Sequence, residues 1–140
     1  MYKFRQKGDT YVVSIDNHQE IVQALAAFCT EQGIFAGEVS GLGAVREATL
    51  CILDSASRRY VDKTFTEQME MAGLVGNISR KDGKAYLHLH ATFARADYTI
   101  IGGHLRSAVL NGACELVVRK FNLELGRRFD AETGLNLYDF

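Results

Sequence analysis

The hydrophobic pattern in the first quarter of the chain predicts one helix. Residues 18–32 carry apolar side chains at the spacing of one helical face, at Ile21, Leu25 and Phe28. Asp16 or Asn17 is expected to cap this helix, because short polar side chains accept hydrogen bonds from the first free backbone amides. Glu20 would then lie in the first turn, and Gly33 would end the helix.

The rest of the chain shows the pattern of strands separated by turns. Apolar or alternating segments predict strands over residues 11–16, 34–45, 48–54, 58–65, 67–79, 84–94 and 113–125, and the second of these could also be a strand pair. Asp82-Gly83 is typical of a hairpin turn, and residues 95–98 are polar enough for a loop. One long helix with six or more strands indicates an α+β domain of two layers.

Length and composition limit the class of protein. The chain has 140 residues, of which 47% are hydrophobic and 24% charged, as expected for one globular domain over residues 1–140. Residues 126–140 are set apart as a C-terminal tail. No apolar stretch approaches the ~18 residues of a membrane span, and the polar N-terminus does not look like a secretion signal. Cys29, Cys51 and Cys114 stand singly in apolar runs, which predicts buried free thiols in a reducing cytoplasm.

The charge balance argues against a nucleic-acid binder that works through electrostatic attraction. Sixteen basic and seventeen acidic residues give a formal net charge of −1. The basic clusters are small: Arg58-Arg59, Arg80-Lys81 with Lys84, and Arg127-Arg128. We therefore expect any binding of duplex DNA to be weak and strongly reduced by salt.

The most informative segment for chemistry is residues 86–93. The two-residue period of a strand places Tyr86, His88, His90 and Thr92 on one face and turns the apolar residues between them toward the core. Imidazoles two positions apart on one strand can converge on one metal ion. His104 follows Gly102-Gly103, and these glycines allow a sharp turn or a close backbone approach that would bring it to the pair.

Three histidines with a fourth position left open is the usual form of a reactive zinc site. We therefore expect His88, His90 and His104 to bind one transition-metal ion per chain, with zinc as the first choice and iron, nickel or copper as alternatives. The competing interpretation is a solvent-facing strand whose polar residues happen to be histidine. Glu70 and Glu115 are candidates for orienting a ligand imidazole or for acting as a base, or are simply charges at a strand edge.

One glycine-rich segment, residues 37–45, contains a G-x-G sequence. A third glycine and a following helix are both missing, so a dinucleotide-binding loop is not expected. The segment instead indicates a strand that bends or lies very close to a neighbour.

Several of these segments together resemble the plants and prokaryotes conserved domain (PPC domain) in its stand-alone prokaryotic form. The resemblance covers nearly the whole chain and includes S-G-L-G-A-V at residues 40–45 and the segment 69–79. The H-L-H of residues 88–90, the G-G-H-L of residues 102–105 and the terminal segment 127–135 resemble the prokaryotic branch.

The resemblance implies an antiparallel sheet with helices packed on it, a homotrimer, and a metal held by the three histidines. Family members are described as candidate DNA-binding proteins because the plant ones carry AT-hooks, which centre on R-G-R-P. This chain has no proline, so that device is absent. Apolar residues of the tail could pack on a neighbouring subunit or on the chain's own sheet: Leu135, Leu137, Tyr138 and Phe140.

Two functions stay open at this point. In the first, the chain is a trimeric regulatory module with a metal site and with DNA, transcriptional or nucleoid-associated partners. In the second, it is a small metal-dependent enzyme, a hydrolase or lyase. A purely structural assembly protein is a weaker third reading. The first is preferred because no acid–base partner is evident; an open pocket with a nearby carboxylate would favour the enzyme.

Overall fold

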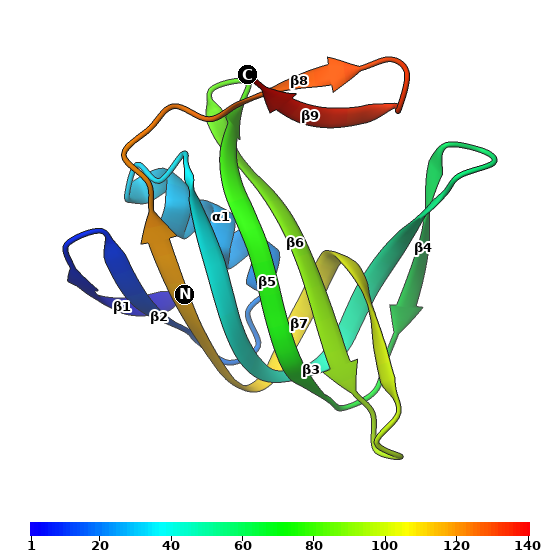
Figure 1. Ribbon diagram of the computed structural model, residues 1–140. Coiled ribbons are helices and arrows are strands. Elements are labelled where there is room, and N and C mark those ends of the chain that lie inside the picture. The colour runs from blue at the N-terminus through cyan, green and yellow to red at the C-terminus, as the bar shows by residue number, and fades with distance from the viewer.

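Nine strands and one helix make up the structure, a computed structural model that describes residues 1–140 (Figure 1). The elements are β1 (Tyr2–Lys7), β2 (Thr10–Ile15), α1 (Ile21–Glu31), β3 (Gly37–Asp54), β4 (Arg59–Phe65), β5 (Met69–Lys81), β6 (Lys84–Ala94), β7 (Ile100–Lys120), β8 (Gly126–Asp130) and β9 (Leu135–Asp139). All strand pairings are antiparallel except a single parallel pair that joins β8 to β5. The α+β class and the mainly antiparallel sheet are therefore confirmed.

The two longest strands, β3 and β7, organise the sheet. Each pairs with the other, β3 also pairs with β5, and β7 also pairs with β6. Because β5 and β6 form a hairpin, the pairings β3–β5–β6–β7–β3 close a circuit of four strands. The far half of β3 pairs with β4, while its residues up to Cys51 still pair with β7 on the other side. Figure 1 shows the end of β3 and β4 projecting from the body of the domain as a two-stranded arm.

Helix α1 packs against β6 and β7 and fills the centre of the domain with apolar side chains. Its buried face consists of Ile21, Ala24, Leu25, Phe28 and Cys29. The Phe28 ring makes edge contacts with the rings of Tyr2, Phe4 and Tyr11, with centroids 5.4–5.5 Å apart. The three cysteines are all free and buried, as predicted. No helix has the length and hydrophobicity needed to cross a membrane.

The start of the helix differs from the prediction. Glu20 is the capping residue, and its carboxylate accepts hydrogen bonds from the backbone amides of Val22 (3.0 Å) and Gln23 (2.7 Å). Neither Asp16 nor Asn17 caps the helix, because the chain between them and the first turn includes His18 in a left-handed conformation, with φ 66°. The end is as predicted, since Gly33 has φ 61°.

Two strand boundaries were also predicted wrongly. Residues 34–45 and 48–54 belong largely to one strand, β3, because irregular pairings near Gly41, Val45 and Glu47 let the strand bend without ending. The strand predicted over residues 113–125 begins earlier and ends at Lys120. The alternation beyond that point does not continue the strand: residues 121–125 form a loop.

Hairpins account for the remaining segments. Asp82 and Gly83 both adopt positive φ, 51° and 77°, as the predicted hairpin turn requires. Residues 126–140, set apart in the sequence as a tail, form the hairpin β8–β9, which contacts the end of β5 (Figure 1).

Candidate metal centre

The predicted faces of β6 are confirmed. Leu89, Ala91 and Phe93 are buried in the core, whereas His88 and His90 lie on the opposite face. The inward side chains fix the strand on the core, and so the outward histidines project from a rigid backbone.

His104 is brought to the pair by the register of β6 and β7. His104 lies directly opposite His90, and it also pairs with Cys51 on β3. The preceding glycines allow the close packing: a Cβ on Gly103 would lie 3.0 Å from the carbonyl oxygen of Cys51, and one on Gly102 would lie 3.0 Å from that of Ala91. The glycines therefore serve close approach rather than a sharp turn, since neither has a positive φ.

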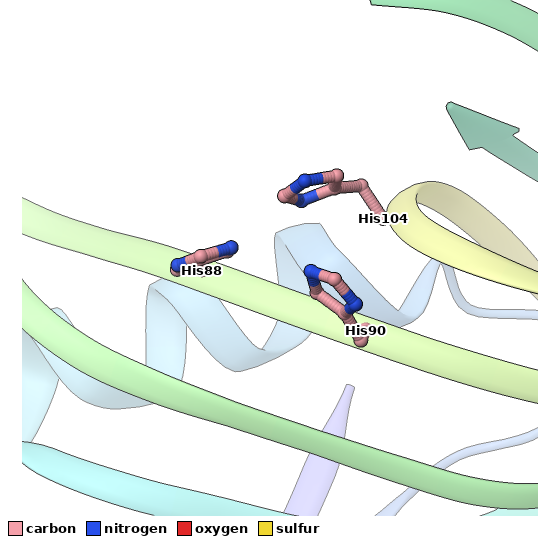
Figure 2. A group of neighbouring side chains, drawn as sticks. All are labelled: His88, His90 and His104. Atoms are coloured by element: carbon pink, nitrogen blue, oxygen red, sulfur yellow. The ribbon is translucent and has the colours of Figure 1, made fainter. Parts of the chain in front are cut away.

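The three histidines form one compact group (Figure 2). One ligand nitrogen from each ring lies within 4.8 Å of the others. The ring centroids of His90 and His104 are 4.1 Å apart, and those of His88 and His104 are 5.0 Å apart with nearly parallel planes. Figure 2 shows the rings gathered around one gap, with two coming from β6 and one from β7.

The surroundings of the group keep two of the imidazoles in their neutral form. Burial lowers the pKa of His88, and the neighbouring His90 and Arg127 lower it further. Burial likewise lowers the pKa of His104, with added repulsion from His90 and His88. A neutral imidazole has a free lone pair, which is the form that binds a metal ion.

One buried nitrogen without a hydrogen-bond partner indicates whether the three histidines fit a metal ion. Nε2 of His88 is buried and has no hydrogen-bond partner. Buried polar nitrogens are nearly always satisfied, so an orphaned imidazole nitrogen beside two further imidazoles is best explained by an ion that the three bind together. The residues present therefore fit a three-nitrogen metal site.

Next to the group lies a cavity of about 250 Å³. His88 and His104 line it together with Tyr60 from the β4 arm and Arg127 from the β8–β9 hairpin. The Tyr60 hydroxyl lies 3.3 Å from Nε2 of His104, within hydrogen-bond distance. Sequence analysis does not single out Tyr60, which looks like any strand tyrosine. It names Arg127 only as part of a small basic cluster and of the terminal segment 127–135, without a role at the histidines.

The two candidate carboxylates lie elsewhere. Glu70 and Glu115 are exposed and line a separate hollow that no histidine lines. The acidic side chain that shares a hollow with His88 and His90 is Glu38, which forms an ion pair of 2.9 Å with Arg119. A role for Glu70 or Glu115 beside a ligand imidazole thus finds no support in their positions.

The glycine-rich segment holds no phosphate loop. Gly41 and Gly43 lie in the middle of β3, which continues as a strand to Asp54. A Cβ on Gly41 would lie 2.4 Å from the backbone oxygen of Glu115 on β7. The prediction of a strand very close to its neighbour is confirmed.

Comparisons with known proteins agree on one family. The family model of the Plants and Prokaryotes Conserved (PCC) domain matches residues 2–122. A crystal structure of a candidate DNA-binding protein from Bacteroides thetaiotaomicron is 48% identical, with a TM-score of 0.97, and the match covers 100% of this chain and 98% of that one.

Two further structures support the same assignment. A metal-containing protein from Archaeoglobus fulgidus is 35% identical with a TM-score of 0.90, covering 100% of this chain and 99% of that one. A candidate DNA-binding protein from Ralstonia eutropha is 27% identical with a TM-score of 0.91, covering 99% and 96%. No curated protein matches the sequence. The chain belongs to the Plants and Prokaryotes Conserved domain family.

Proposed function

We propose that His88, His90 and His104 hold one transition-metal ion per chain, zinc in the first place, and that the adjoining cavity receives a small molecule that such an ion would polarise. The observation that carries the proposal is the convergence of three imidazoles, one with an orphaned buried nitrogen, beside a cavity that His88 and His104 line. The relative from Archaeoglobus fulgidus, described as metal-containing, is consistent with it. This cavity favours a metal-dependent enzyme, a hydrolase or lyase, over the regulatory module preferred from the sequence. No carboxylate lines it, and Tyr60 is the candidate proton donor instead.

Each residue of the site has a distinct part in this proposal. A bound ion supplies Lewis acidity toward an oxygen of the ligand. The three histidines hold the position for it, and the remaining side of the group faces the cavity, where a ligand can enter. Tyr60, within hydrogen-bond distance of His104, can donate its phenolic proton to a ligand oxygen there. Burial raises the pKa of Tyr60, so this proton is retained at neutral pH.

Metal analysis of the protein purified without a histidine tag tests the site. We expect about one transition-metal ion per chain, lost in the His88→Ala/His90→Ala double variant. His18→Asn is the matched control: His18 is the fourth histidine, it is exposed, and asparagine tolerates its positive φ. Full metal occupancy in the double variant would contradict the proposal.

DNA binding is a second candidate function, favoured by the description of two relatives as candidate DNA-binding proteins. The surface charges limit its strength in this chain. Arg106, Arg119 and Arg128 each form an ion pair with a carboxylate, and the net charge is −1. Arg127, half of one predicted basic cluster, is held by contacts within its own chain rather than displayed on the surface. Only weak, non-specific duplex binding is expected.

We also propose that the chain forms a homotrimer. Apolar side chains on neighbouring strands line one broad hollow and are roughly half exposed: Val12, Leu42, Val75 and Val117. A contiguous apolar surface of this kind is typical of a contact between protein chains. The number three comes from the family resemblance. The tail gives less support than expected, because Leu135 and Leu137 line the cavity of their own chain and only Phe140 is fully exposed.

A further inference from the structure

Arg127 is held in a fixed position by its own chain, yet one of its nitrogens is left free. Its Nε donates to Oγ of Ser79 and its Nη1 to the carbonyl oxygen of Asn136, both at 2.9 Å. The guanidinium lies over two aromatic rings, 4.1 Å from the centroid of Tyr138 and 5.0 Å from that of Tyr86. Nη2 is buried and has no hydrogen-bond partner.

The charge of this side chain is also unpaired. Arg127 forms no ion pair, and no acidic residue lines the cavity on which it lies. The other arginine on the wall, Arg106, is already paired with Asp62 at 3.2 Å. A partly buried guanidinium without a counter-charge is unfavourable, and it favours an anion as its missing partner.

Two unsatisfied buried nitrogens thus belong to one cavity. Nε2 belongs to His88, one of the three histidines, and Nη2 belongs to Arg127, another residue that lines the cavity. The cavity holds about 250 Å³, which is smaller than the usual drug-sized pocket and suits a molecule of few heavy atoms. Besides the residues with polar groups, those that line it include the apolar Leu135 and Leu137 of the C-terminal hairpin.

We propose that Arg127 binds the carboxylate of a small organic acid whose second oxygen, a hydroxyl or carbonyl, binds the metal at the histidines. This inference rests on the proposed metal site. A carboxylate is favoured over a phosphate because a single guanidinium nitrogen is free: one oxygen can be satisfied there, whereas a phosphate dianion would need several donors. The short apolar wall fits an aliphatic chain between the two ends.

The histidines and Arg127 come from different parts of the chain. The histidines lie within residues 2–122, which the family model matches, whereas Arg127 and the wall at Leu135 and Leu137 belong to the C-terminal hairpin outside that segment. The segment that the family model matches thus supplies the metal ligands, and the C-terminal hairpin supplies the charge that selects the ligand.

Calorimetric titration of the metal-loaded protein tests the assignment, with lactate, its neutral analogue lactamide, and inorganic phosphate as probes. We expect lactate to bind at least tenfold more tightly than either of the others. Arg127→Gln should weaken lactate binding about 10- to 100-fold, the usual loss for a hydrogen bond to a charged group, while the metal content stays unchanged. Arg128→Gln, which removes an equal charge from the exposed neighbour, should leave lactate binding as it is.

The outcomes separate this inference from the proposed function. Equal binding of lactate and lactamide by the wild-type protein would overturn the anion site, even if the Arg127 variant fails to fold. Tighter binding of phosphate would overturn the choice of a carboxylate. Unchanged lactate affinity in a folded Arg127→Gln protein would overturn the role of that residue. If no metal is found, the proposed function fails, while lactate binding that still depends on Arg127 would support the anion site alone.

Discussion

Glu20 connects the helix to the sheet, and its removal offers a quantitative test of the fold. One carboxylate oxygen accepts hydrogen bonds from the amides of Val22 in α1 (3.0 Å) and Ala108 in β7 (2.9 Å), and the other accepts from Gln23 (2.7 Å). The side chain therefore caps the helix and satisfies a buried strand amide at the same time, since Ala108 is 1% exposed.

After Glu20→Ala, the helix amides and the Ala108 amide differ in whether water can replace the lost carboxylate. The helix amides can turn to water, so the lost cap should destabilise the fold by about 1 kcal/mol. The Ala108 amide lies in the core and is left unsatisfied, which adds about 1–3 kcal/mol. We expect a total loss of about 2–4 kcal/mol in the free energy of unfolding. Glu20→Gln keeps one acceptor oxygen for Val22 and Ala108, and should lose only about 1 kcal/mol.

Urea unfolding followed by circular dichroism measures these values. All variants are compared at one protein concentration, because self-association contributes to the apparent stability. Gln23→Ala is the control: this side chain is exposed on the same turn, and its replacement should change the free energy by less than about 0.5 kcal/mol. A loss below about 1 kcal/mol for Glu20→Ala, or equal losses for Ala and Gln, would refute the assignment of a buried, shared acceptor.

Four further predictions concern the charge, surface and burial of the chain. Light scattering at micromolar concentration should give the mass of a trimer, and a monomer would contradict the proposed assembly. Anisotropy titrations with duplex DNA should show weak binding that salt abolishes; nanomolar, sequence-selective binding at physiological salt would make DNA the ligand. Burial raises the pKa of Cys29 and Cys114 to about 12, so a thiol reagent at pH 8 should modify neither until urea is added. In the unfolded chain these two thiols lose their protons above the ordinary thiol pKa of 9.0, whereas in the folded chain they retain them. The free energy of unfolding should therefore fall as the pH rises past 9.0.

The features that sequence predicts well here are those set by local periodicity. The buried face of α1 and the division of β6 into an apolar and a histidine face follow from side-chain spacing alone. The approach of His104 also follows from a local signal, because two adjacent glycines allow close packing of the strand that carries it.

The features that sequence misses depend on partners far along the chain. Glu20 caps the helix partly because Ala108 supplies a third amide, and no pattern near residue 20 reveals that neighbour. β3 continues past its glycines because irregular pairings with β5 and β7 absorb the bend. Tyr60 and Arg127 join the histidines through a projecting arm and a terminal hairpin, whose positions are set by the whole sheet.

The closed circuit of β3, β5, β6 and β7 has a consequence for how the chain acquires its structure. Gly37 pairs with Lys120, so the circuit joins segments from opposite ends of the domain and closes only when β7 is complete. A growing polypeptide on the ribosome must therefore hold β3 with an unpaired edge until β7 emerges, a state open to aggregation. With so many contacts between distant segments, refolding in vitro should take milliseconds to seconds rather than microseconds. His104 pairs with His90 across the short β6–β7 connection, so the three histidines can come together before the far end of β7 closes the circuit.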